Sequence, residues 1–168
     1  MIEDAAAIFT VEQLSEEHKL IARTADDFLA NEVAPALDRL EQKDWGVARA
    51  LIRRSGELGL LGTDVPEEYG GVDLDKVSSI IVGEAVGRVA SFASTFGAQT
   101  GLVITPLVCF GTDDQKRRYL PRIVSGEIIG AYALSEACSG SDALGARTRA
   151  VRRARLIRSR LRSAHRRR

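Results

Sequence analysis

The residues best suited to chemistry lie in one stretch, Gly130 to Gly145, which reads GAYALSEACSGSDALG. Its second half gathers glycine and small polar side chains, so a ligand can approach bare backbone amides there. Such amides, with two or three serine hydroxyls beside them, suit the polar edge of a flavin or a pyrophosphate group. A plain turn has the same composition, and spacing alone favours it. The residues before and after this stretch must therefore decide between a ligand-binding loop and a turn.

The elements that position this loop are mostly helical. Capping boxes at Thr10–Gln13 and Thr112–Gln115 mark two helix starts, and apolar residues between them recur at helical spacing. Immediately before the loop, the apolar run Ile128 to Leu134 has the length and flanks of a buried strand. The pattern predicts helices over about 15–34, 47–58, 75–89 and 112–124, and over 91–110 either one buried helix or two pieces broken near 97–101 or at Pro106.

The composition is that of one globular domain of 168 residues, with 45% hydrophobic and only 5% aromatic residues, which favours helices. The net charge of +1 combines two unlike segments. Nine of the 24 basic residues are arginines within 152–168, which leaves 15 against 23 acidic residues, a net charge of −8, for residues 1–151. The body is acidic and the tail is strongly basic.

The basic tail, residues 152–168, has few sizeable apolar side chains and is expected to be disordered. A nucleic-acid-binding arm is normally attached to a domain with a basic face, whereas this body is acidic. Nucleic acid is therefore not an expected partner.

The two cysteines, Cys109 and Cys138, form no CxxC pattern, so neither a disulfide framework nor a zinc site is expected, and no other metal site is predicted. Residues 1–8 carry two acids and no basic residue, unlike a signal peptide. No apolar run is judged long enough to cross a bilayer. These features predict a reducing, cytoplasmic location.

Three sequence blocks, in order and at fitting distances, resemble the acyl-CoA dehydrogenase family. The first is ELGLLG at Glu57–Gly62 followed by VPEEYGG at Val65–Gly71. The second runs from Gly111–Thr112 through QK and YLP to SGE at Ser125–Glu127. The third, AYALSE at Ala131–Glu136 leading to Gly140-Ser141-Asp142, resembles the family's flavin-contacting segment. The resemblance covers about residues 13–150.

This resemblance implies a mainly α fold: an N-terminal helical bundle over residues 1–126, then the beginning of a middle β-domain with its first strand over residues 127–151. Residues 152–168 remain as the basic tail. Family members bind FAD and oxidise an acyl-CoA to a trans-2-enoyl-CoA in fatty-acid β-oxidation. A glutamate removes the α-proton while a hydride passes to the flavin, which electron-transferring flavoprotein reoxidises. The family also forms homodimers and tetramers.

Individual residues take their expected roles from the same resemblance. Tyr132, Ala133, Leu134 and Ser135 are expected to line the flavin ring. Gly140 and Ser141 are expected beside the FAD pyrophosphate, with Ser141 also near the CoA part of the substrate. The segment 91–107 is expected to form a wall of the acyl pocket.

The loop departs from the commoner family pattern, because Ala137-Cys138-Ser139 stands where Pro-Gly-Ala is usual. Loss of the proline loosens the turn by a few tenths to about 1 kcal/mol. The string Ser139 to Asp142 is more similar to the very-long-chain branch, which hints at substrate length.

No catalytic residue is assigned, because the family's glutamate base belongs to a C-terminal bundle that these residues do not include. Glu84 and Glu136 are expected to be structural, since a general base must reach the substrate proton. Asp142 is expected to be a loop or capping acid. His18 and His165 are expected to be exposed to solvent.

The arginine-rich tail begins where the family continues into β-strands, and our hypothesis is that it results from a shifted reading frame. Two other functions stay open. The chain is either part of a same-fold flavin monooxygenase or oxidase, or a non-catalytic interaction protein that uses its basic tail.

Overall fold

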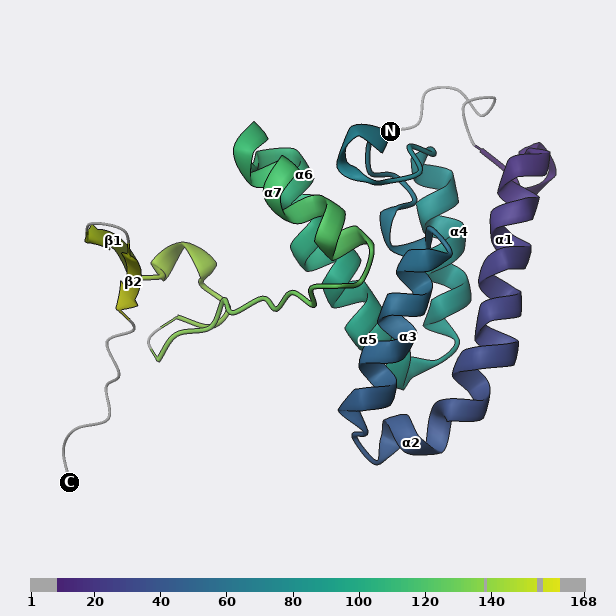
Figure 1. Cartoon of the computed structure of the whole chain (residues 1–168), viewed down its shortest axis with the longest axis horizontal. Helices are drawn as coiled ribbons and strands as arrows, with labels where there is room; N and C mark the ends of the chain where they lie inside the picture. Colours follow the sequence, from purple (N-terminus) through teal and green to yellow (C-terminus); the bar gives the residue numbers. More distant parts are fainter. Residues whose placement is uncertain (1–8, 138, 154–155, 161–168) are drawn as a thin grey trace. The chain divides into compact units, whose positions relative to one another are not determined.

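The computed structural model describes residues 9–137, 139–153 and 156–160. The chain divides into two units, one ending at Ala131 and one beginning at Tyr132. Figure 1 shows the helices of the first unit and the short strands of the second. The expected mainly α fold is confirmed.

The first long helix, α1 (Glu16–Phe28), begins at Ser15, whose hydroxyl accepts the N–H of His18 at 3.1 Å. It continues without a break into π-helical turns just before Pro35, which has no N–H to donate. The predicted helix over 15–34 is therefore confirmed, with its last turns widened. The continuation comprises η3 (Leu29–Val33), η4 (Ala34–Ala36) and α2 (Leu37–Glu41).

The other helices also follow the sequence pattern, and three of them begin at a capping side chain. Asp44 caps α3, Asp75 caps α4 and Thr112 caps α7. The segment after α4 is one continuous helical stretch whose middle is π-helical, which resolves the two alternatives for 91–110. The elements are η2 (Val11–Gln13), α3 (Trp45–Glu57), η5 (Leu60–Gly62), η6 (Glu67–Tyr69), α4 (Lys76–Gly87), α5 (Ala90–Gly97), η7 (Ala98–Ile104), α6 (Thr105–Phe110) and α7 (Asp113–Val124).

The core of this unit is apolar and draws on α1, α3, α4, α5 and α7. Phe28 and Phe92 meet edge to face with ring centroids 5.8 Å apart. Ile52, Val82 and Leu120, from α3, α4 and α7, are buried in the same core cluster. Packing of these faces, rather than helix propensity alone, holds the bundle together.

The turn between α3 and α4 explains the glycines of the first sequence block. Gly70 has a φ of 85°, in the left-handed region that favours glycine. At Gly71 a Cβ atom would lie 1.9 Å from the carbonyl oxygen of Val65, so no larger residue fits there. These two positions bring the turn back against the bundle.

The helical stretch Ala90–Phe110 corrects the expectation that no apolar run in the sequence is long enough to cross a bilayer. At 21 residues, it is long and apolar enough, by length and composition alone, for a membrane span. In this fold, however, Phe92, Phe96 and Ile104 are buried in the core of the bundle. Buried Gln99 donates to the carbonyls of Ile123 and Ile128 and accepts the N–H of Gly130. The stretch is therefore a bundle helix with one exposed apolar side.

The contacts of Gln99 also set the boundary between the units, because they tie Ile128 and Gly130 to the bundle. The first unit consequently ends at Ala131, later than the expected residue 126. The strand predicted over Ile128–Leu134 does not form. A strand needs a neighbour to share its backbone hydrogen bonds, and no described segment pairs with this one.

The second unit contains a 3-10 turn, η8 (Ala143–Gly145), and two strands, β1 (Arg149–Arg153) and β2 (Leu156–Arg160). The strands are antiparallel, with Arg149 opposite Arg160 and Arg153 opposite Leu156. Disorder was expected from residue 152 onward, so this pairing is a correction. Val151 and Ile157 are β-branched and favour strands. The remaining tail residues, 154–155 and 161–168 with His165, lie outside the described residues.

Candidate functional site

The segment Tyr132–Ser135 leaves its backbone and side chains open to solvent. All four residues are exposed, and the side chain of Tyr132 keeps 55% of its accessible surface. Within the described part of the chain, none of the four makes a hydrogen bond through its backbone or side chain. Their peptide groups are therefore available to a ligand with donors and acceptors along one edge.

The next segment folds into a loop around Ser139. The N–H of Glu136 donates to the carbonyl of Ser139 at 2.8 Å, and the N–H of Ser139 donates back at 3.2 Å. Ser139 is only 4% exposed, and its hydroxyl donates to the carbonyl of Asp142. Gly140 and Ser141 lie exposed between them, and a Cβ at Gly140 would meet no atom within 4 Å. The loop thus offers backbone and a hydroxyl without covering side chains.

Two acids, Asp142 and Glu136, hold this loop in place. The sequence predicted a structural role for each of them. Asp142 accepts the N–H of Gly145 at 3.1 Å and caps η8. The carboxylate of Glu136 accepts the N–H groups of Arg147 and Thr148, each at 2.8 Å. A hydrogen bond from the Thr148 side chain, followed by those from the backbone N–H groups of Arg147 and Thr148, lowers the pKa of Glu136 below its ordinary value. Such a carboxylate is a weak proton acceptor.

A separate cavity lies within the helical unit, between α4 and the stretch α5–η7. It holds about 270 Å³. The hydroxyl of Ser79, on α4, is buried there without a hydrogen-bond partner among the described residues. The predicted acyl-pocket segment supplies one wall, through Ala93, Phe96, Gly97, Thr100, Gly101, Ile104 and Thr105.

The walls of this cavity contain glycines at positions where the described residues leave space for a side chain. At Gly83, Gly87, Gly97 and Gly101 a Cβ would meet no atom within 4 Å. Glycine inside a helix costs about 1 kcal/mol relative to alanine. No described residue packs so closely against these four glycines that a side chain would be excluded. The space beside them is therefore open to a ligand or to a segment outside the described residues.

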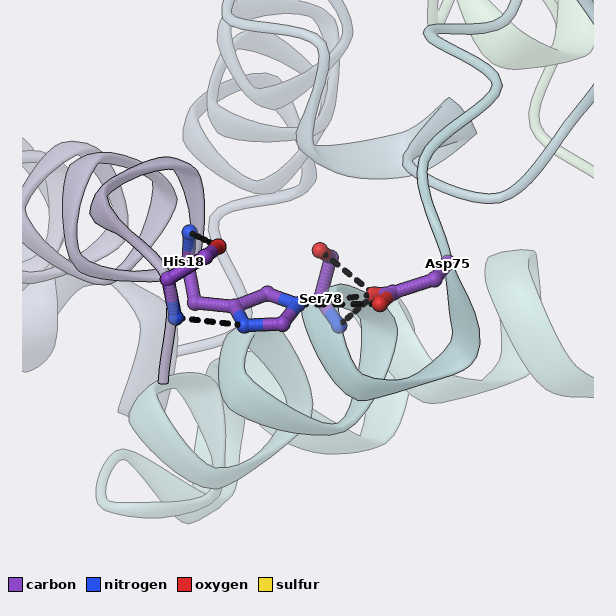
Figure 2. Close-up of polar contacts among 4 residues, drawn as sticks. His18, Asp75 and Ser78 are labelled. Carbon is purple, nitrogen blue, oxygen red and sulfur yellow. Dashed lines mark hydrogen bonds and ion pairs between the residues drawn. The ribbon is translucent and has the colours of Figure 1, made fainter. Parts of the chain in front are cut away.

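One polar cluster lies where the sequence predicted an exposed histidine. Figure 2 shows the ring of His18, on α1, directed toward Asp75 at the start of α4. His18 is 7% exposed, and its Nε2 lies 3.0 Å from Oδ2 of Asp75. Its Nδ1 accepts the N–H of Ser15 at 3.1 Å. The prediction for His18 is therefore wrong: the ring joins the starts of two helices.

This cluster lacks the arrangement of a nucleophilic triad. The hydroxyl of Ser78 donates to Asp75, at 2.9 Å, rather than to His18. The N–H of Ser78, at 2.8 Å, is the main cause of a lowered pKa at Asp75. Asp75 thus caps α4 and also contacts His18 of α1.

The predicted site residues Tyr132–Ser135, Gly140 and Ser141 all fall in the second unit. Cys138, which stands between them in the sequence, lies outside the described residues. In the described ranges no group of three metal-ligating side chains converges. Glu84 is exposed on α4. The anchoring role of Ser139 was missed, because a buried serine in a polar loop leaves no periodic signal.

The comparisons with known proteins agree on one family. The family description "Acyl-CoA dehydrogenase, N-terminal domain" matches residues 15–127. The chain is 48% identical over 153 residues to "Probable acyl-CoA dehydrogenase" of Bacillus subtilis (strain 168), covering 90% of this chain and 26% of that protein.

Solved structures agree with the sequence match. The acyl-CoA dehydrogenase of Bacillus anthracis complexed with FAD has a TM-score of 0.82 and 53% identity, over 85% of this chain and 25% of that one. A chain in the structure of the electron transferring flavoprotein of Acidaminococcus fermentans has a TM-score of 0.78 and 35% identity, over 88% and 39%. The chain thus spans only about a quarter to two fifths of these relatives.

Proposed function

Because this chain belongs to the acyl-CoA dehydrogenase family, we propose that it forms part of an FAD-dependent site that oxidises acyl-CoA to trans-2-enoyl-CoA. The observation that carries the proposal is the largely exposed loop from Tyr132 to Ser141, whose sequence resembles the family's flavin-contacting motif. The family match and the similarity to an FAD complex support it.

The residues of the loop fit FAD. The peptide groups of Tyr132–Ser135, which have no partner among the described residues, suit the polar edge of a flavin ring, with Ser135 adding its hydroxyl. The exposed backbone of Gly140 and the hydroxyl of Ser141 suit a pyrophosphate, with Ser141 also near the CoA portion. When bound, FAD supplies the hydride acceptor. The chain's part is to bind and orient it.

The cavity of the helical unit supports a second part of the proposal, an acyl-binding wall on residues 91–107. Its lining is mainly apolar, and the glycines along it leave room for an elongated ligand. Apolar burial drives the binding of an acyl chain, at about 0.8 kcal/mol for each CH₂ group removed from water.

Within the described residues, neither Glu136 nor Glu84 is arranged as a base for the α-proton. Both carboxylate oxygens of Glu136 accept backbone N–H groups, and Glu84 is exposed on α4. We therefore propose that these 168 residues do not catalyse the oxidation by themselves.

The experiment is a visible absorbance spectrum of the purified chain, before and after adding acyl-CoA with an electron-accepting dye. We expect no stoichiometric flavin band and no reduction of the dye. A saturated flavin band with turnover would contradict the statement that the site is incomplete.

Further features belong to the proposal as well. Electron-transferring flavoprotein is proposed as the electron acceptor, supported by the similarity to a chain from a structure of such a protein. Homo-oligomerisation, a role in β-oxidation and a preference for longer acyl chains follow from the family resemblance. A reducing, cytoplasmic compartment is proposed as well, and the free, exposed thiol of Cys109 is compatible with it.

A further inference from the structure

The loop that carries Gly140 and Ser141 is closed at both ends by one residue, Glu136. At its start, the backbone of Glu136 exchanges two hydrogen bonds with Ser139. At its end, the carboxylate of Glu136 accepts the N–H groups of Arg147 and Thr148, 11 and 12 residues along the chain. Residue 148 directly precedes β1. Glu136 thus joins the start of the loop to the entry of the first strand.

Inside the loop, Ser139 and Asp142 add hydrogen bonds of their own, but apolar packing contributes little. Among the described residues from 132 to 149, Ser139 is the one that is buried. Leu144, the largest apolar side chain in the turn η8, is 100% exposed. A loop without an apolar core takes its shape from its hydrogen bonds, and those to a carboxylate are the stronger ones.

We propose that Glu136 is a positioning residue, which fixes the backbone of Gly140 and Ser141 in the arrangement that receives the FAD pyrophosphate. The assignment of the ligand rests on the proposed function. The two hydrogen bonds that the Glu136 carboxylate accepts from Arg147 and Thr148 form the Glu136 clamp. They are observed whatever ligand the loop binds. Glu136 acts through the loop and touches neither substrate nor cofactor.

The chemistry of the clamp requires a carboxylate rather than any polar side chain. Each oxygen of Glu136 accepts one N–H, at 2.8 Å in both cases. A glutamine of the same size would direct its NH₂ group at one of these two donors, so one hydrogen bond would be replaced by a donor–donor contact. Glu136→Gln therefore removes half of the clamp without changing its volume.

The protonation of Glu136 provides a second way to open the clamp. Hydrogen bonds to the ionised form lower the pKa of a carboxyl group, and the pKa of Glu136 is lowered. The clamp is therefore complete above the ordinary pKa of glutamate, and it is lost as the pH falls through the lower pKa of the folded loop.

The experiment follows the amide signals of the whole ¹⁵N-labelled chain by NMR, in the wild type, Glu136→Gln and the control Glu84→Gln. In the wild type we expect the amides of Arg147 and Thr148 to be protected from exchange and to shift together on acidification. We expect Glu136→Gln to abolish this acid-induced shift and to expose one of the two amides. Glu84→Gln, which changes an exposed acid on α4, is expected to leave both unchanged.

A titration with FAD then tests the positioning role in the same samples. We expect FAD to shift the amides of Gly140 and Ser141 in the wild type, with an affinity about tenfold weaker in Glu136→Gln for one lost charge-assisted hydrogen bond. Unprotected Arg147 and Thr148 amides in the wild type, or equal FAD affinities in both chains, would overturn the assignment of Glu136. Absence of FAD-induced shifts in every chain, with the clamp intact, would instead contradict the proposed function and the ligand it supplies.

Discussion

The helical unit and the loop unit are stabilised by different interactions. In the helical unit, Phe92, Ile52 and Leu120 are almost completely buried, and α1, α3, α4 and α7 begin at capping side chains. In the loop unit, the described residues up to 149 bury Ser139 alone and depend on the hydrogen bonds of Glu136 and Asp142. The first unit buries enough apolar surface to fix one packing. The second exposes the groups that a ligand needs.

This contrast separates a scaffold from a binding segment. Apolar burial contributes about 1.5–3 kcal/mol for each large side chain, whereas a typical hydrogen bond contributes about 1 kcal/mol. Mutations in the helical unit should therefore change global stability, and mutations in the loop should change local structure and ligand affinity.

The largest effect is expected from Phe92→Ala in the core of the helical unit. Phe92 is 1% exposed and contacts the rings of Phe28 and Phe96. Its truncation should lower the free energy of unfolding by about 3–5 kcal/mol, measured by urea denaturation followed by circular dichroism. Tyr132→Ala, in the exposed segment, serves as the control and should change it by less than about 0.5 kcal/mol. Similar losses for both variants would remove the contrast between the units.

The cap of α4 should give the next largest effect. Asp75→Ala loses the acceptor for the N–H of Ser78 and the partner of His18, which should cost about 2 kcal/mol in unfolding free energy. Asp75→Asn keeps a capping oxygen and should lose less. If the alanine and asparagine variants are equally stable, the cap is not what Asp75 contributes.

The same residue predicts a pH dependence. The pKa of Asp75 is lowered in the folded chain, mainly by the N–H of Ser78. Its contribution is therefore present above the ordinary pKa of aspartate, about 3.9, and is lost as the pH falls through the lower folded value. Urea midpoints measured at several pH values should fall less steeply on acidification in Asp75→Asn than in the wild type. Parallel curves would contradict this assignment.

The smallest effect concerns the glycines along the cavity. Gly97→Ala should stabilise the chain by about 0.5–1 kcal/mol, because the residue has helical φ and ψ and its new Cβ meets no atom within 4 Å. The matched substitution Gly71→Ala should destabilise it, since that Cβ would lie 1.9 Å from the carbonyl oxygen of Val65. Both are measured as thermal midpoints. A destabilising Gly97→Ala would mean that the bundle itself needs this glycine.

The sequence predicted the helical unit well because its signals are local. Thr112 and Gln115 form the expected capping box, and the apolar spacing of α1 marks its buried face. His18 was placed wrongly although it precedes Ile21 by three residues and Ala25 by seven, on that same face. The prediction gave more weight to the polarity of histidine than to its position on the apolar face. Its partner Asp75 is 57 residues away in the chain, so no local pattern pointed to it.

The second unit was less predictable, because its structure depends on partners that are not local. The apolar run from Ile128 to Leu134 has the composition of a strand, yet a strand forms only beside another. Gln99, which donates to the carbonyl of Ile128 and accepts the N–H of Gly130, holds both residues to the bundle instead. The composition of Tyr132 to Ser141 was compatible with a flavin or a pyrophosphate but favoured a plain turn, and the family resemblance decided for FAD.

The most direct test of the account is a map of the amide signals of the ¹⁵N-labelled chain that respond to FAD. The central claim is that the loop unit receives the cofactor while the core of the helical unit acts as scaffold. It predicts shifts concentrated at Tyr132–Ser135, Gly140 and Ser141, with none around the buried rings of Phe28 and Phe92. An unchanged loop, or shifts confined to the helical core, would contradict it.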